Sequence, residues 1–114
     1  MDKKLETLIM ANDYMYNLEK GIQVIVEKFE EDDDAEGFKL IYVMCEGIEW
    51  LGKSIELTKD IHKVTIRIEP IVDVLKGILE AIENQDTMLI GDKLNYELLT
   101  ILEDVHKKIK LSIE

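Results

Sequence analysis

The sequence predicts an all-α protein: a four-helix up-down-up-down bundle with long helices and an extended segment before the third helix. Three observations carry this prediction. Apolar residues recur at steps of three and four along most of the 114 residues. One proline and six glycines are few, so few turns are expected. The predicted helix lengths also match one another, as a bundle requires. Residues 1–114 are expected to form a single domain, because a chain of this length hardly accommodates two cores.

The first two helices are predicted at residues 2–31 and 35–62, with a short acidic loop between them. Their apolar residues share one helical face, which is the expected core face. Gly52 lies on that face of the second helix and is expected to let another helix approach closely. The core residues expected here are Leu8, Ala11, Met15, Leu18, Ile22, Ile25 and Phe29, followed by Phe38, Ile41, Met44, Cys45, Ile48, Leu51 and Ile55.

The segment "HKVTIRIEP" changes the pattern to a period of two, which predicts an extended connection with one packed side. Pro70 then suits the first position of a third helix, expected at residues 70–85. A fourth helix is expected from about Asp86, the predicted N-cap, to about Ser112. Gly91 falls on its core phase and is expected to allow close packing. The core residues expected in the third helix are Ile71, Leu75, Ile78 and Ile82, with Val74 and Leu79 beside them, and those expected in the fourth are Leu94, Leu98, Ile101, Leu102, Val105 and Ile109.

The net charge of −11 limits the classes of partner. Such a field repels phosphate backbones and anionic headgroups, so the sequence argues against nucleic-acid and membrane binding and favours basic partners. Cys45 is the single cysteine, and no apolar run has the length of a membrane span. We therefore expect a cytoplasmic protein without an intramolecular disulfide.

Chemistry-bearing motifs are weak in this sequence. Asp32, Asp34 and Glu36 begin like a calcium loop, but Val43 stands where the bidentate glutamate belongs. The two histidines have no second ligand at zinc spacing, and there is no glycine-rich phosphate loop. Acidic pairs at helical spacing leave a metal-dependent all-α nucleotide pyrophosphohydrolase as one alternative. The main expectation is a protein that is not an enzyme and has no catalytic residue, metal site or cofactor.

A second apolar stripe exceeds what a bundle core needs. Val43, Trp50 and Leu57 are spaced by seven and lie opposite the core face of the second helix. Leu89 and Tyr96 likewise face away from the core of the fourth helix. Exposed apolar patches containing tryptophan are typical of binding surfaces. These five residues are the predicted partner-binding site, for a homodimer or another protein. The alternative is a splayed bundle in which Trp50 covers loop residues such as Ile66.

Two segments carry a resemblance. "EGIEWLGKSIELTKD" and the run from Asn84 to Leu98 resemble a group of small uncharacterised all-helical proteins from anaerobic Gram-positive bacteria, a domain of unknown function. That group usually has a proline shortly after Tyr-Glu-Leu-Leu. Thr100 stands there in this chain, which implies a straighter fourth helix. The resemblance implies no activity and therefore no catalytic residue.

A fainter similarity, in size, charge and helix pattern, is to flagellar export chaperones, which hold segments of partner proteins along apolar grooves. The sequence as a whole predicts an interaction module that self-associates or binds a partner protein. An export chaperone or adaptor for a motility or cell-surface protein is the first alternative.

Overall fold

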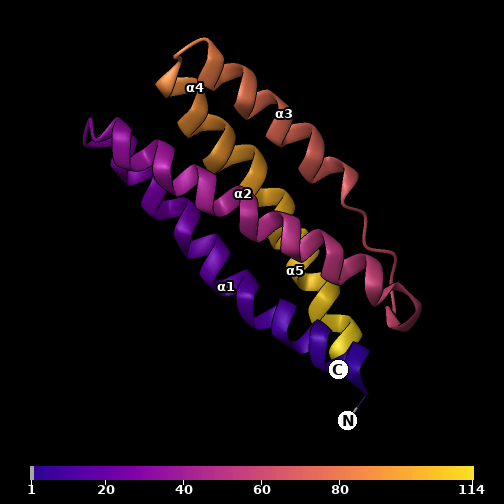
Figure 1. Cartoon of the computed structure of the whole chain (residues 1–114). Helices are drawn as coiled ribbons and strands as arrows, with labels where there is room; N and C mark the ends of the chain where they lie inside the picture. Colours follow the sequence, from indigo (N-terminus) through magenta and orange to yellow (C-terminus); the bar gives the residue numbers. More distant parts are fainter. Residues whose placement is uncertain (1) are drawn as a thin grey trace.

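The computed structural model describes residues 2–114, and its helices are joined by short turns except for the longer connection between α2 and α3 (Figure 1). In chain order the elements are α1 (Lys3–Glu30), α2 (Asp34–Leu57), a 3₁₀ turn (Lys59–Ile61), α3 (Glu69–Glu83), α4 (Thr87–Asp92), a π-helical segment (Lys93–Leu98) and α5 (Leu99–Ile113). The last three elements join without a break, so they form the fourth helix of the bundle. The predicted all-α bundle is confirmed.

The four helices do not pack equally against one another. α1 packs against α2 along its length and against α5 on another side, while α3 packs against α4 and the π-helical segment. α2 and α3 are not closely packed together. Figure 1 shows the start of α1 and the end of α5 at one end of the molecule, and the α1–α2 and α3–α4 turns at the other. The bundle is therefore open along the α2–α3 side.

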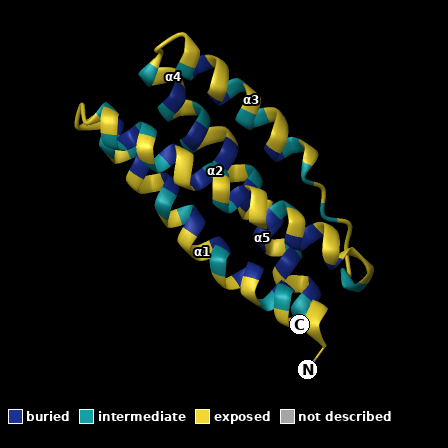
Figure 2. Ribbon diagram, viewed as in Figure 1, coloured by how far each residue is buried: buried dark blue, intermediate teal, exposed yellow. Residues whose placement is uncertain are grey.

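The core lies where the helical spacing predicted it, as the buried positions in Figure 2 show. All seven residues expected in α1 are buried, from Leu8 to Phe29. Burial of such side chains supplies most of the free energy that favours folding. Leu79 was expected beside the core, and this prediction is wrong, since 53% of its surface is exposed. The buried face of α3 is narrow, centred on Ile71, Ile78 and Ala81.

Short polar side chains set the helix ends. Asp2 caps α1 and Asp86 caps α4, with the Asp86 carboxylate accepting from the Leu89 amide at 3.1 Å. The prediction for Asp86 is thus confirmed. Helix α2 was expected to reach residue 62 but ends at Leu57, after which the Ile61 and His62 amides donate three residues back, to the Thr58 and Lys59 carbonyls, and the chain tightens into a 3₁₀ turn. Helices α3 and α4 are separate.

The connection from α2 to α3 is extended over residues 62–68, as the period-two pattern predicted. No strand occurs within residues 2–114, so this segment pairs with no sheet. Ile66 and Ile68 are half-buried and pack against the core, whereas Val64 between its polar neighbours is exposed. The segment therefore carries the chain back along the bundle while exposing only one of its three apolar side chains.

The π-helical segment is a departure that the sequence analysis missed. Ile90, Leu94, Leu98 and Leu102 are all fully buried although they are spaced by four. In an α-helix each step of four turns by roughly 40° beyond a full circle, so this row would rotate out of the core. A π turn holds more residues and keeps the row in line. The straighter fourth helix was expected only because Thr100 replaces a proline, and the sequence analysis did not predict a π-helical segment at Lys93–Leu98.

Candidate protein interface

Trp50 lies on α2 with 38% of its surface exposed, and its ring contacts α1. The Tyr14 ring meets it edge to face, with centroids 5.5 Å apart and planes at 81°. Tyr14 crosses α2 at Gly47, where a side-chain methyl would overlap its hydroxyl. The loop residue Ile66, which the alternative interpretation placed under Trp50, lines a different hollow together with Ile55 and His62. An aromatic pair instead bridges α1 and α2 on their outer side.

Two hollows adjoin this aromatic pair on the outer face of α1 and α2. One, of about 410 Å³, is lined by Met10, Asp13, Tyr14, Asn17, Gly47 and Trp50. The other, of about 230 Å³, shares Tyr14 and Asn17 and includes Leu18, Gly21, Val24, Ile25, Leu40, Val43 and Met44. Together these residues form the α1–α2 face. Asp13 is the sole charged residue among the described residues that line it.

The five residues predicted to bind a partner are all exposed, but they do not form one surface. Val43 and Trp50 lie together on the α1–α2 face. Leu57 is 68% exposed at the last position of α2, outside both hollows. Tyr96 lines a third hollow on another side of α1, and Leu89 lies on α4. The sequence pattern missed Tyr14 and Met10, because their positions on α1 lie beside the core stripe.

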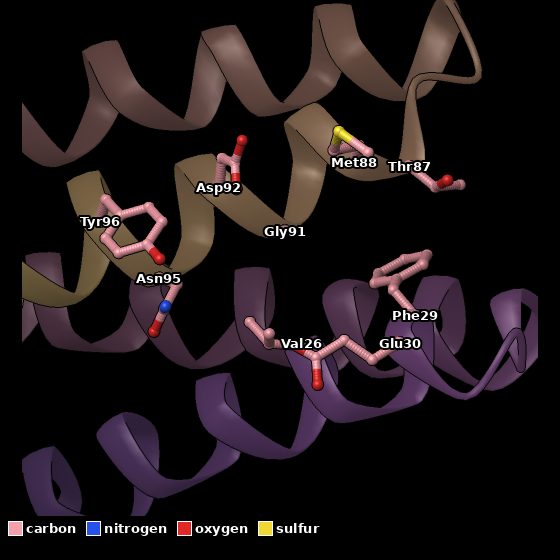
Figure 3. A pocket seen from close by; sticks show the side chains of 9 residues that line it. All are labelled: Val26, Phe29, Glu30, Thr87, Met88, Gly91, Asp92, Asn95 and Tyr96. Atoms are coloured by element: carbon pink, nitrogen blue, oxygen red, sulfur yellow. The ribbon is translucent and has the colours of Figure 1, made fainter.

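The third hollow lies between the end of α1 and the start of the fourth helix (Figure 3). Its volume is about 310 Å³. The prediction that Gly91 allows close packing is wrong, since nothing lies within 4 Å of where its Cβ would be. Its missing side chain opens the hollow instead. The lining residues are Val26, Phe29, Glu30, Thr87, Met88, Gly91, Asp92, Asn95 and Tyr96.

A fourth hollow, of about 410 Å³, follows the open side between α2 and α3. Its apolar lining includes Ile48, Ile68, Val72 and Leu75, with Glu49, Lys53 and Glu56 on the α2 side. Gly52 also lines it, and a Cβ there would meet Ile68 Cδ1 at an ordinary 3.9 Å. The expected close approach of another helix at Gly52 is therefore wrong.

Cys45 lines the same α2–α3 hollow and is half-buried rather than fully enclosed. Burial raises the pKa of its thiol. A raised pKa lowers the thiolate fraction at neutral pH, which makes the thiol a poor nucleophile.

One buried histidine and one loop aspartate make contacts within the fold. His106 is buried between α1 and α5, with Nδ1 2.8 Å from a Glu19 oxygen. In the acidic loop, Asp33 caps α2 by accepting from the Glu36 amide. Within residues 2–114 no three Asp, Glu, His or Cys side chains converge as a metal site would require. No helix in the described range combines the length and apolar character needed to cross a membrane.

Comparison with known proteins gives a family match. A family model described as a domain of unknown function, DUF8042, matches residues 6–108. No curated protein and no solved structure is significantly similar to the chain. The expected resemblance to a domain of unknown function is confirmed at this level, and the match covers all or most of every helix described above.

Proposed function

We propose that this chain, which belongs to the DUF8042 family of unknown function, is a non-enzymatic interaction module that forms a homodimer through its α1–α2 face. The observation that carries the proposal is the composition of that face. Its hollows are lined by aromatic, aliphatic and methionine side chains with Asp13 as the one described charged residue. Depletion of charge with enrichment of aromatic residues and methionine is typical of interface cores.

Charge also favours a second copy of the chain as the partner that covers the α1–α2 face. Each chain carries a net charge of −11, so most surfaces of two copies repel one another. The α1–α2 face contributes little to that charge, so two chains meet there with the least repulsion. A two-fold axis would place the same patch on both sides, which a self-complementary apolar face satisfies.

Tyr14 and Trp50 lie where binding energy is expected to concentrate. Tryptophan and tyrosine are among the residues most enriched at hot spots. Their edge-to-face contact holds both rings in place before association, which lowers the entropy lost on binding. Val43 extends the patch along α2 and is 56% exposed in the single chain.

The mass in solution tests the proposal. Light scattering over a series reaching high micromolar concentration should give twice the chain mass of 13.2 kDa. Trp50→Ala and Val43→Glu should both return the mass to that of one chain, with far-UV circular dichroism unchanged. Leu111→Glu is the matched control, because Leu111 is 47% exposed on α5, outside both hollows. A monomeric parent protein at every concentration would refute the dimer.

The α2–α3 hollow favours the alternative of a chaperone or adaptor. It is an apolar channel between two helices that do not pack closely, which is the form of a groove that holds a helix of another protein. A nucleotide pyrophosphohydrolase would need converging carboxylates, and the described residues hold no such group. A cytoplasmic location accords with the single cysteine and stays part of the proposal.

A further inference from the structure

We propose that the end of the bundle formed by the α1–α2 and α3–α4 turns binds an arginine- or lysine-rich segment of another protein, with the hollow in Figure 3 as its anchor point. This site is separate from the α1–α2 face and does not depend on dimer formation. Three observations carry the inference: the distribution of charge, the lining of the hollow, and the space at Gly91.

Most of the net charge lies at this end. Residues 27–36 hold seven carboxylates and one lysine, and residues 80–97 hold five carboxylates and one lysine. These two segments carry −10 of the total −11, and Lys39 on α2 and Lys76 on α3, each about one turn further along its helix, reduce the net charge of this end to −8. The topology brings both turns to the same end of the molecule (Figure 1). We call this end the acidic end.

The hollow adds features that a bare acidic surface lacks. Met88 and Tyr96 are 80% and 70% exposed at its edges, and Phe29 lies at its base. Figure 3 shows Glu30 on α1 and Asp92 on the fourth helix, where the Asp92 side chain points away from α1. An arginine side chain fits this lining, because its stem packs on apolar atoms and its guanidinium stacks on an aromatic ring or pairs with carboxylates.

A polypeptide fits this end better than a small amine does. The carboxylates extend well beyond the hollow into both turns, so one bound cation would leave most of them without a counter-charge. A segment with several basic residues neutralises more of them. The stems of its side chains also cover Met88 and Tyr96, at the edges of the hollow.

Binding can be measured by fluorescence anisotropy with a short labelled peptide in which arginine and leucine alternate. The wild-type protein should bind it saturably, with a Kd below about 100 μM. The affinity should fall as NaCl is raised from about 0.05 M to about 0.5 M, because exposed charges are screened. A peptide with glutamate in place of arginine should not bind.

Gly91→Leu tests whether the peptide binds in the hollow or is held only by general attraction between opposite charges. Nothing lies within 4 Å of the Cβ position, and Gly91 lines the hollow, so a leucine there would extend into the hollow with no change of charge. We expect the Kd to rise by about tenfold or more. Asp92→Asn should also weaken binding, whereas Asp104→Asn, an equal charge change on α5, should alter the Kd by less than about twofold.

Three outcomes would overturn the proposal: no saturable binding of the arginine peptide, an equal Kd for wild type and Gly91→Leu, or equal effects of the two aspartate substitutions. Stronger competition by spermidine than by the unlabelled peptide would also contradict it and would indicate a polyamine site. Trp50→Ala should leave peptide binding unchanged, so failure here and failure of the dimer are distinguishable.

Discussion

Two glycine substitutions should have opposite effects on stability, although each adds one methyl group to a long helix. Gly21→Ala places a Cβ where nothing lies within 4 Å. Alanine in a helix interior is favoured over glycine by about 1 kcal/mol, so this variant should be more stable by that amount. Gly47→Ala gains the same propensity but overlaps the Tyr14 ring, whose Cζ would lie 2.7 Å from the new Cβ.

The Tyr14 ring must then leave its place on α2. Its edge-to-face contact with Trp50 contributes about 0.5–1.5 kcal/mol, and displacing a packed group costs about 1–3 kcal/mol. These terms exceed the gain in propensity, so Gly47→Ala should lower the free energy of unfolding by about 1 kcal/mol. The expected gap between the two variants is about 2 kcal/mol.

Urea denaturation followed by circular dichroism measures this gap, since both variants expose similar surface on unfolding. Tyr14→Ala supplies the control: in that background the overlap is absent, so Gly47→Ala should stabilise as Gly21→Ala does. Equal stabilisation by both substitutions in the parent chain would refute the packing of Tyr14 across Gly47.

Three further predictions concern buried and half-buried side chains that can titrate. Glu19→Gln should lower the free energy of unfolding by about 1–3 kcal/mol, measured in urea, because it weakens the one acceptor of the buried His106 Nδ1; no change would contradict the structural role of the pair. Burial raises the Cys45 pKa, so its alkylation rate should reach half-maximum at a higher pH than that of a cysteine peptide; a profile at or below the peptide's would contradict this. Burial lowers the His62 pKa, so the unfolded chain binds this proton more readily and stability should fall as pH drops below about 6.5; His62→Gln should make the urea midpoint depend less on pH in that range, and an unaltered dependence would exclude His62 as a source.

The sequence predicted the fold well where a single period governed the chain. The α1 stripe from Leu8 to Phe29 keeps one face through alternating steps of three and four, and every member is buried. Asp86 was also predictable as an N-cap, since a short carboxylate before an apolar run satisfies free amides.

Prediction failed where the local period changed or where contacts between helices decided the outcome. The π-helical segment shifted the core position from Gly91 to Ile90, and the uninterrupted spacing of four from Ile90 to Leu102 is the signal that would have shown it. The crossing of Tyr14 over Gly47 depends on how α1 and α2 are aligned, which no pattern within one helix contains. The exposed apolar residues of α2 were predicted, whereas Met10 and Tyr14, which extend the same surface on α1, were not.

The placement of charge bears on how two copies would be oriented. The molecule measures 46 × 21 × 18 Å, and its acidic end lies at one extremity of the long axis. Two chains joined side by side through their α1–α2 faces would repel strongly if they were parallel, since both acidic ends would then be neighbours. An antiparallel pair separates them and presents one acidic end at each tip of the rod. Such a dimer is bivalent, and a partner with two basic segments at matching spacing would bind it with far greater avidity than either segment alone.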